Sequence, residues 1–380
     1  MAASLYVHWP FCLSKCPYCD FNSHVRRAVD TTEWCDAILQ DLRYEASQTS
    51  DSLTSLFFGG GTPSLMEPAL VADIIEEAHR SFGFDADVEI TLEANPTSVE
   101  TERFAALAAA GVNRVSLGVQ SFRDDALRFL GRGHGSVDAH HALDVAQAVF
   151  GRVSFDLIYA RPGQDEAAWR AELAEGLARE TEHLSLYQLT IEPGTRFATE
   201  VRRGTFAPLD DDAAAALYDV TGATMERAGL PAYEISNYAR PGAESRHNLT
   251  YWRYRDYIGI GPGAHGRRGG IATQRHRKPE NYLAAVARTG HGIAQQSLLS
   301  RADGLTEAIL MGLRLREGIS PDLLGERFGT GAIFDERKVR LHVAGGLLER
   351  TGDRMRATHE GMRVLDALLA DIVAGDLMAA

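Results

Sequence analysis

The sequence predicts an α/β protein built on a parallel sheet, followed by a mainly helical C-terminal region. In its first half, short β-rich runs alternate with helix-like stretches. The strand-like runs are nearly continuous in apolar residues, as expected for strands that are covered on both faces. From about residue 303, helical periodicity replaces this alternation. Six β–α repeats indicate a parallel sheet, which forms either a barrel or an open doubly wound sheet, and periodicity does not separate the two.

The predicted elements follow one another regularly up to residue 230. The strands comprise residues 4–9, 53–58, 87–93, 113–119, 152–159 and 183–189. The helices comprise residues 68–80, 98–110, 165–179 and 211–229. In the first of these helices, the apolar residues recur at i, i+4 and i+8, which places them on one face. Ser98 can cap the second helix and Gly111 can end it.

The C-terminal region has the pattern of a winged helix. Helices are expected over 305–318, 321–329, 335–346 and 360–373, with a hairpin over 347–358. Residues 301–380 contain 11 Arg or Lys against 13 Asp or Glu. DNA binding requires an excess of positive charge to neutralise phosphates. We therefore expect this region to pack against the rest of the protein or to cover a substrate.

Composition limits the class of protein. The 380 residues carry a formal net charge of −13, which disfavours nucleic acid and anionic membranes as partners. The N-terminus lacks the pattern of a signal peptide, and no window approaches 18 consecutive apolar residues. The sequence therefore predicts a cytoplasmic protein without stable membrane insertion. We expect three units: residues 1–200, an extension over 201–295, and the helical winged unit over 296–380.

Three of the four cysteines, Cys12, Cys16 and Cys19, form a C-x3-C-x2-C motif just after the first predicted strand. A structural zinc site needs four ligands, and His8 or His24 would have to supply the fourth at an unusual spacing. Chance clustering of buried cysteines is a second alternative. The pattern favours an iron–sulfur cluster with one iron left without a protein ligand, since cubane clusters are normally held by four thiolates. Cys35, which lies in a helix-like stretch, is expected to pack as a small apolar residue.

Glycines and polar residues follow several predicted strands. The run FFGGGTPS (57–64) lacks the G-K-[ST] of a P-loop, and its glycines allow the backbone to approach a ligand closely. GIGPGAHG (259–266) is not followed by a helix pattern, which disfavours a dinucleotide site. The polar residues at other strand ends are Glu93, Gln120 and Asp156, and Arg132 follows the fourth strand. Each could be a turn residue, but barrel enzymes place their chemistry at these strand ends.

The cysteine motif in a loop after the first strand resembles the radical S-adenosylmethionine (SAM) superfamily. The resemblance implies a partial (β/α)6 TIM-like barrel and a 4Fe–4S cluster held by the three cysteines. It also implies that the open iron chelates the amino and carboxylate groups of SAM. Electron transfer then yields a 5′-deoxyadenosyl radical. The glycine loop would hold the methionine end of SAM through Gly60, Gly61 and Thr62.

Longer strings resemble the coproporphyrinogen dehydrogenase-like branch of that superfamily. They comprise residues 4–24, 57–64, 91–96, 118–133, 155–164 and 187–195. The resemblance implies that Tyr6, Gly60 and Glu93 meet the SAM on the cluster. It also implies that a further set matches the positions that hold a second SAM in the dehydrogenase: Tyr18, Gly61, Thr62, Gln120, Arg132 and Asp156.

Two departures from the dehydrogenase resemble the HemW-type haem chaperones instead. Phe21 stands where the dehydrogenase has a further cysteine, and the first cysteine is already residue 12, without the dehydrogenase's N-terminal extension. HNLTYW (247–252) also resembles the H-N-x-x-Y-W motif of these chaperones. That family binds haem and delivers it to membrane respiratory proteins. The resemblance therefore implies haem as cargo, haem-receiving partners and an electron donor.

The region around this motif suits haem on physical grounds. Residues 241–280 contain eight Arg or Lys against three Asp or Glu, together with four interleaved aromatic residues. Aromatic faces could cover a porphyrin ring, and Arg side chains could bind its propionates. His247 is a candidate haem ligand. Alternatively, the motif is a structural turn that buries Trp252 in a domain seam. A coproporphyrinogen dehydrogenase, or another radical SAM enzyme acting on nucleic acid or peptide, remains an alternative function.

Overall fold

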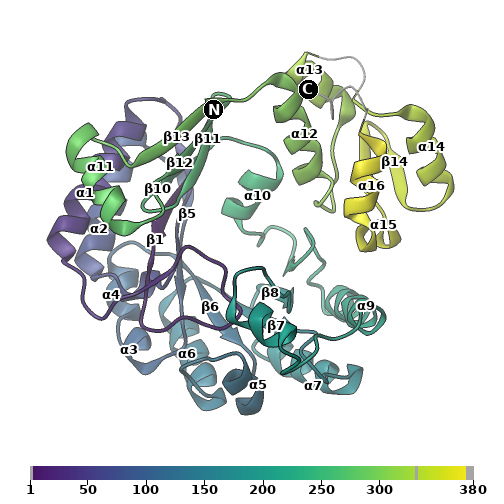
Figure 1. Cartoon of the computed structure of the whole chain (residues 1–380), viewed down its shortest axis with the longest axis horizontal. Coiled ribbons are helices and arrows are strands. Elements are labelled where there is room, and N and C mark those ends of the chain that lie inside the picture. Colours follow the sequence, from purple (N-terminus) through teal and green to yellow (C-terminus); the bar gives the residue numbers. More distant parts are fainter. Residues whose placement is uncertain (1–2, 330–332, 374–380) are drawn as a thin grey trace.

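A computed structural model describes residues 3–329 and 333–373 of the chain (Figure 1). The protein is built on an open, curved sheet with helices on its outer side. Six parallel strands lie next to one another in chain order. They are β1 (Ala3–Trp9), β4 (Leu53–Gly60), β5 (Phe84–Ala94), β6 (Arg114–Gln120), β7 (Arg152–Tyr159) and β8 (His183–Gln188). The prediction of a partial (β/α)6 barrel is confirmed: β1 and β8 pair with other strands and not with each other.

Additional strands extend both edges of the six-stranded core. β9 (Asn237–Ala239) pairs antiparallel with β8, and β10 (Tyr257–Ile260) pairs parallel with β1. Beyond β10 follow the antiparallel strands β11 (His265–Arg268), β12 (Ile271–Arg275) and β13 (Ile293–Leu298). The glycine-rich run 259–266 thus forms β10 and the turn into β11. At Gly261, φ is +91° and an added Cβ would lie 2.3 Å from the carbonyl oxygen of His8.

Helices connect the strands of the sheet. They are α1 (Thr31–Ala46), α2 (Pro68–Phe82), α3 (Ser98–Thr101), α4 (Phe104–Ala109), α5 (Asp124–Phe129), α6 (Ser136–Val149), α7 (Glu166–Leu177), α8 (Arg196–Arg202), α9 (Asp211–Arg227), α10 (Arg246–Trp252) and α11 (Pro279–Thr289). Most of them cover the outer side of the sheet, whereas α10 packs on the concave side against β1 and β4 (Figure 1). The single helix predicted over 98–110 is divided into α3 and α4. The buried carboxylate of Glu100 accepts hydrogen bonds from the Ser64 hydroxyl and the Asn95 N–H. These tertiary bonds fix α3 against the glycine loop, which local periodicity does not reveal.

The C-terminal region has its own hydrophobic core, formed by residues between 305 and 373. It contains α12 (Arg301–Gly312), α13 (Pro321–Phe328), α14 (Glu336–Ala344), the hairpin β14 (Leu348–Thr351) and β15 (Arg354–Ala357), α15 (His359–Arg363) and α16 (Leu365–Ile372). Ile319 adds an antiparallel bridge to Met355, which completes the wing. The mostly helical winged fold is therefore confirmed, whereas the predicted unit boundaries at residues 200 and 295 remain predictions.

The C-terminal region contacts the barrel near α10, along α9 and at the Tyr233 carbonyl oxygen, which accepts from the Arg316 N–H. Near α10, the Arg253 guanidinium forms two hydrogen bonds of 2.9 and 2.8 Å with the Glu317 carboxylate. At α9, His359 of α15 lies 2.9 Å from Asp219. The region therefore bridges α9 and α10 across the concave side of the sheet (Figure 1).

Candidate radical SAM site

The three motif cysteines lie in one loop, residues 10–26, which we call the cluster loop. Cys12, Cys16 and Cys19 are half-buried free thiols, and all three line the same cavity of about 1170 Å³. The described residues do not contain three or more His, Cys, Asp or Glu side chains that converge on one metal ion. A cubane cluster does not require such convergence, since each thiolate binds a different iron. Three unpaired thiols on one cavity wall thus fit the donor set of such a cluster.

Hydrogen bonds fix the cluster loop to the barrel. The Asn22 side-chain amide donates to the carbonyl oxygens of Pro262 and Arg277, both at 2.9 Å. The His24 N–H donates to the carbonyl oxygen of Pro10 at 2.7 Å and so closes the loop on itself. These bonds anchor the loop without using the cysteines, so the thiols stay available.

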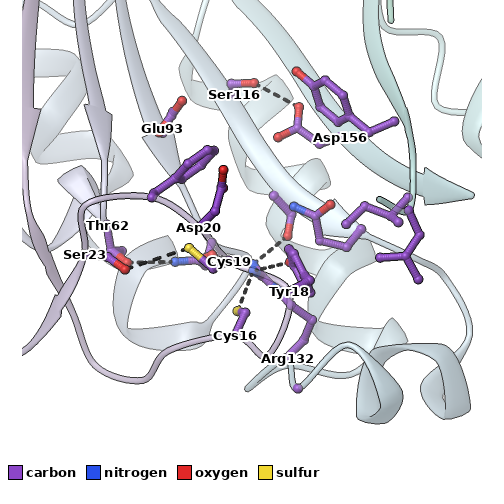
Figure 2. A pocket seen from close by; sticks show the side chains of 18 of the residues that line it. Cys16, Tyr18, Cys19, Asp20, Ser23, Thr62, Glu93, Ser116, Arg132 and Asp156 are labelled. Carbon is purple, nitrogen blue, oxygen red and sulfur yellow. Dashed lines mark hydrogen bonds between the residues drawn. The ribbon is translucent and has the colours of Figure 1, made fainter. Parts of the chain in front are cut away.

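Arg132 joins the cluster loop to the strand ends (Figure 2). Its Nη1 donates to the Cys16 sulfur at 3.4 Å and to the Tyr18 hydroxyl at 3.3 Å. Its Nη2 donates to the carbonyl oxygen of Gly118 at 2.9 Å and to the Asn95 side chain. The buried Nε has no partner within the described residues. Arg132 therefore places positive charge beside the thiol and retains an unused donor in the cavity wall.

The glycine loop follows β4 and lies against the cluster loop. The Gly60 N–H donates to the Glu93 carboxylate at 3.1 Å, and its φ of +110° is in the region that favours glycine. The Gly61 N–H donates to the Trp9 carbonyl oxygen at 2.7 Å, and an added Cβ would lie 2.6 Å from the Phe11 carbonyl oxygen. Thr62 also lines the cavity. Gly60 is therefore favoured by its positive φ, and Gly61 by the close approach of the Phe11 backbone, in addition to the predicted close approach of a ligand.

The polar residues predicted at strand ends meet in this cavity. Glu93 and Gln120 lie at the ends of β5 and β6, whereas Asp156 is an inner residue of β7 and not its end, and all three line the cavity together with Arg132. Desolvation, followed by the charge of Asp156, raises the pKa of Glu93 to about 7. Desolvation likewise raises the pKa of Asp156 to about 6, although Ser185 and Arg114 oppose the increase. The cavity thus concentrates carboxyl groups that a bound cation would stabilise in ionised form.

Gln120 is held in a strained conformation. Its φ is +67°, and its buried side-chain oxygen has no hydrogen-bond partner within the part of the chain that the structure describes. Strained residues with unsatisfied polar atoms are typical of ligand sites. This observation supports the predicted role of Gln120 in binding.

Sequence reasoning missed the wall of the cavity that lies opposite the cluster loop. Its members come from β8, α9 and α15 and the segment before β9: Tyr187, Tyr218, Ile235, Met362 and Arg363. Tyr187 alone lies in a string that resembles the dehydrogenase branch. The others come from segments far apart in the chain, and no local pattern marks them. The C-terminal region therefore contributes to the cavity directly, as expected of a region that covers a substrate.

Tyr6 lies apart from the other predicted SAM contacts, in a neighbouring cavity of about 400 Å³. Its hydroxyl lies 3.0 Å from His8 Nδ1, and His8 Nε2 lies 3.0 Å from the Asn22 carbonyl oxygen. A carbonyl only accepts, so Nε2 carries the proton and Nδ1 accepts from Tyr6. Gly60 and Glu93 line both cavities. Contact between Tyr6 and SAM stays a prediction, and both nitrogens of His8 are already in use.

His247 is not brought together with the other predicted residues. Its ring is buried between α10 and β4, with its centroid 4.5 Å from that of Phe57 and 5.9 Å from that of Tyr6. Desolvation, with a contribution from Arg114, lowers its pKa to about 3. His247 does not line either of the two cavities. Haem ligation by His247 therefore stays a prediction, and it would require α10 to move.

The local positive charge of residues 241–280 is largely neutralised by distant segments. Ion pairs join basic residues of this region to carboxylates elsewhere: Arg246 to Asp87, Arg253 to Glu317, Arg267 to Glu307, Arg268 to Glu45, and Arg275 to Asp41 and Glu45. The expected broad surface of free arginines is therefore absent among these described residues. The excess of charge in the sequence serves mainly to hold the edge of the sheet to α1, α12 and the hairpin region.

Comparisons with known proteins agree with this geometry. Residues 6–174 match the radical SAM superfamily, and residues 299–364 match the HemN C-terminal domain. The chain is 40% identical to the mitochondrial radical S-adenosyl methionine domain-containing protein 1 of Mus musculus, over 98% of this chain and 87% of that protein. It is 37% identical to the heme chaperone HemW of Escherichia coli, over 96% and 97% of the two chains.

Among solved structures, the coproporphyrinogen III oxidase HemN of Escherichia coli has the same fold. The TM-score is 0.81 at 21% sequence identity, over 97% of this chain and 89% of that one. At this identity the likeness concerns the fold alone. The similarity in sequence to HemW and its vertebrate relatives extends over nearly the whole chain. The chain therefore belongs to the HemW family of the radical SAM superfamily, whose cofactors are a 4Fe–4S cluster and SAM.

Proposed function

We propose that this protein is a haem chaperone, which binds haem and delivers it to recipient proteins. The observation that carries the proposal is its likeness, over nearly the full length, to proteins described as heme chaperone HemW. Phe21 supports it, because this residue replaces the further cysteine that the dehydrogenase carries. The exposed fraction of Phe21 is 59%, so its place in the cluster loop is not that of a core residue.

We further propose that Cys12, Cys16 and Cys19 hold the cluster. When bound, the cluster supplies an electron to SAM at an iron that lacks a protein ligand. Glu93 and Gly60 would bind SAM at the cluster, with Tyr6 behind them. The neighbouring set of Tyr18, Gly61, Thr62, Gln120, Arg132 and Asp156 would bind the remainder of the ligand or a second SAM. Burial of the carboxyl groups, together with the half-buried cluster loop, would keep water away from the reactive centre.

Coproporphyrinogen dehydrogenase activity is the alternative. The fold shared with HemN and the large cavity lined by Arg132, Arg363 and tyrosines favour it. Another radical SAM activity on nucleic acid or peptide is a second alternative, which the net charge of −13 disfavours. Isolation of the protein with bound nucleic acid would revive that possibility.

Location and partners also belong to the proposal. No helix within the described residues is both long enough and apolar enough to cross a membrane. We place the protein in the cytoplasm, with membrane respiratory enzymes as recipients of haem and a separate electron donor for the cluster. Cell fractionation tests the location, since relatives from vertebrates are described as mitochondrial.

Anaerobic reconstitution followed by two parallel assays tests the function. The reconstituted protein is titrated with haemin and, separately, incubated with coproporphyrinogen III, SAM and a reductant. Stable haem uptake without turnover supports the chaperone. Conversion of the porphyrinogen at a rate comparable with that of a known dehydrogenase would replace it with the alternative.

A further inference from the structure

The second cavity, of about 400 Å³, is lined by Tyr6, Gly60 and Glu93, which are proposed to bind SAM, and its other residues have no role in the function as proposed so far. It lies against the concave face of the sheet beside β1, β10 and β11, and α10 and the cluster loop also contribute to its wall. Its volume falls in the range of about 300 to 1,000 Å³ that is usual for small-molecule sites. Residues 241–280 contribute Tyr251, Tyr257, Gly263, Ala264, His265 and Arg277 to its wall.

We propose that this second cavity binds the haem cargo, with His265 as the imidazole ligand of the iron and Arg277 as the partner of a propionate. The inference rests on the proposed function as a haem chaperone and assigns its cargo site. It replaces a site centred on the buried His247 with one centred on an exposed histidine 18 positions further along the chain.

His265 has the accessibility that His247 lacks. It is exposed on β11 and lines the cavity, and its Nε2 lies 3.3 Å from the Gln274 side-chain nitrogen. Nδ1 has no hydrogen bond to any described residue. Desolvation, followed by the charge of Arg277, lowers the pKa of His265, which favours the neutral imidazole that binds metals. Imidazole is a common protein ligand of haem iron.

Arg277 supplies a free guanidinium at the same cavity. It is exposed, and its guanidinium forms no ion pair or hydrogen bond with any described residue, in contrast to Arg267, Arg268 and Arg275 nearby. Guanidinium groups bind carboxylates by two parallel hydrogen bonds. His265 and Arg277 both line this cavity. An anionic group and a metal could therefore be bound together at this cavity.

Aromatic rings complete the wall. Tyr251 and Tyr257 lie edge to face, with centroids 4.4 Å apart, and Phe21 contributes a largely exposed ring from the cluster loop. A flat apolar ring packs well against such faces. Because the cavity is open rather than enclosed by the chain, part of the ring would remain exposed, as a carrier that must release its cargo requires.

The cluster loop forms a wall of both cavities through Phe21, and Gly60 and Glu93 are also shared. Asn22, which lies next to Phe21, donates to the Arg277 carbonyl oxygen. Cargo in the second cavity would therefore contact the loop that holds the cluster. This arrangement gives a direct path by which cluster occupancy could alter haem affinity.

Two porphyrins separate the roles of the two residues. The reconstituted full-length protein is titrated anaerobically with haemin and with metal-free protoporphyrin IX. His265→Ala should weaken haemin binding by about tenfold or more and shift its Soret band, while the affinity for the metal-free ring stays unchanged. Arg277→Gln should weaken binding of both compounds by about three- to tenfold. His141→Ala, at an exposed histidine on α6, is the matched control and should change neither.

Thermal unfolding of each variant establishes that it is folded, and His265→Gln provides a second variant of similar polarity. Unchanged haemin affinity and an unchanged Soret band in both His265 variants would overturn the assignment. A wild-type protein that binds neither porphyrin would instead overturn the proposed function itself, so the two failures are distinguishable. Equal weakening of both porphyrins by His265→Ala would also remove His265 as the iron ligand.

Discussion

Replacing Glu93 by glutamine should stabilise the cofactor-free protein at pH 8 and change its stability little at pH 4.5. In the folded protein the pKa of Glu93 is raised from an ordinary value of 4.5 to about 7. Between these values the folded state holds a proton that the unfolded chain has released, so folding becomes less favourable as the pH rises. One pKa unit corresponds to about 1.4 kcal/mol. Ionised Glu93 therefore costs about 3 kcal/mol of folding free energy above pH 7.

Glutamine removes this cost but weakens one hydrogen bond. The Gly60 N–H donates to the Glu93 carboxylate at 3.1 Å, and a neutral acceptor in its place is weaker by about 1 kcal/mol. The net gain at pH 8 is thus about 2 kcal/mol. Because the charge of Asp156 is the second cause of the raised pKa, the gain should be smaller in an Asp156→Asn background. Glu76→Gln, at an exposed glutamate on α2, should change stability by less than about 0.5 kcal/mol at both pH values.

Urea unfolding, followed by tryptophan fluorescence at pH 4.5 and pH 8 under anaerobic conditions, measures these differences. A glutamine variant that is equally stable or less stable than wild type at pH 8 would refute the argument, because the carboxyl would then ionise freely in the folded protein. The same variant should bind SAM about tenfold more weakly after cluster reconstitution, since it lacks the negative charge opposite a cationic ligand. Stability and binding should therefore change in opposite directions.

Three further predictions concern the cluster loop and its surroundings. Cys16→Ala should prevent cluster assembly, measured as iron per protein after reconstitution, whereas Cys35→Ala should retain wild-type iron because that thiol lies on α1 against α2. Gly61→Ala should lower cluster retention and the melting temperature, since its Cβ would lie 2.6 Å from the Phe11 carbonyl oxygen; Gly133→Ala, which has open space, should do neither. His247→Ala should reduce the free energy of unfolding by about 2 to 3 kcal/mol, and unchanged haemin affinity of the folded variant would remove His247 as a haem ligand.

The sequence predicts the barrel well because its strands depend mainly on local composition. Strands that are covered on both faces need continuous apolar runs, and β7 (Arg152–Tyr159) has the predicted bounds. The polar strand ends were predictable for a related reason. In a parallel sheet the carboxyl ends of neighbouring strands meet at one edge, which brings Glu93 and Gln120 together, and Asp156 reaches the same cavity from within β7. These inferences require chain order and periodicity only.

Features that depend on contacts between distant segments could not be predicted in this way. The far wall of the large cavity joins β8, α9 and α15, whose relative positions are set by the packing of the C-terminal region. The division of 98–110 into two helices depends on bonds from Glu100 to Ser64 and Asn95. In both cases a tertiary contact, and not a local preference, decides the outcome.

Residues 241–280 show why a sum of charges along the chain is a weak guide to a binding surface. The net charge of +5 in that segment is real, yet its arginines differ in what surrounds them. Arg275 is fully buried against Asp41 and Glu45 of α1. These carboxylates compensate its charge, and its buried guanidinium is not accessible to a ligand. Arg277, two residues further along the chain, lies beyond the end of β12 and meets no carboxylate of the described residues. Whether an arginine of this segment is paired therefore depends on the alternation of the strand and on its end, because Arg275 points toward α1 and finds acidic partners, whereas Arg277 lies past the strand and finds none among the described residues. The same alternation places His265 and Arg267 on one face of β11 and Arg268, which pairs with Glu45 of α1, on the other. On the first face Arg267 is buried and paired with Glu307, whereas His265 is exposed, so the strand's position alone does not decide which side chain is accessible.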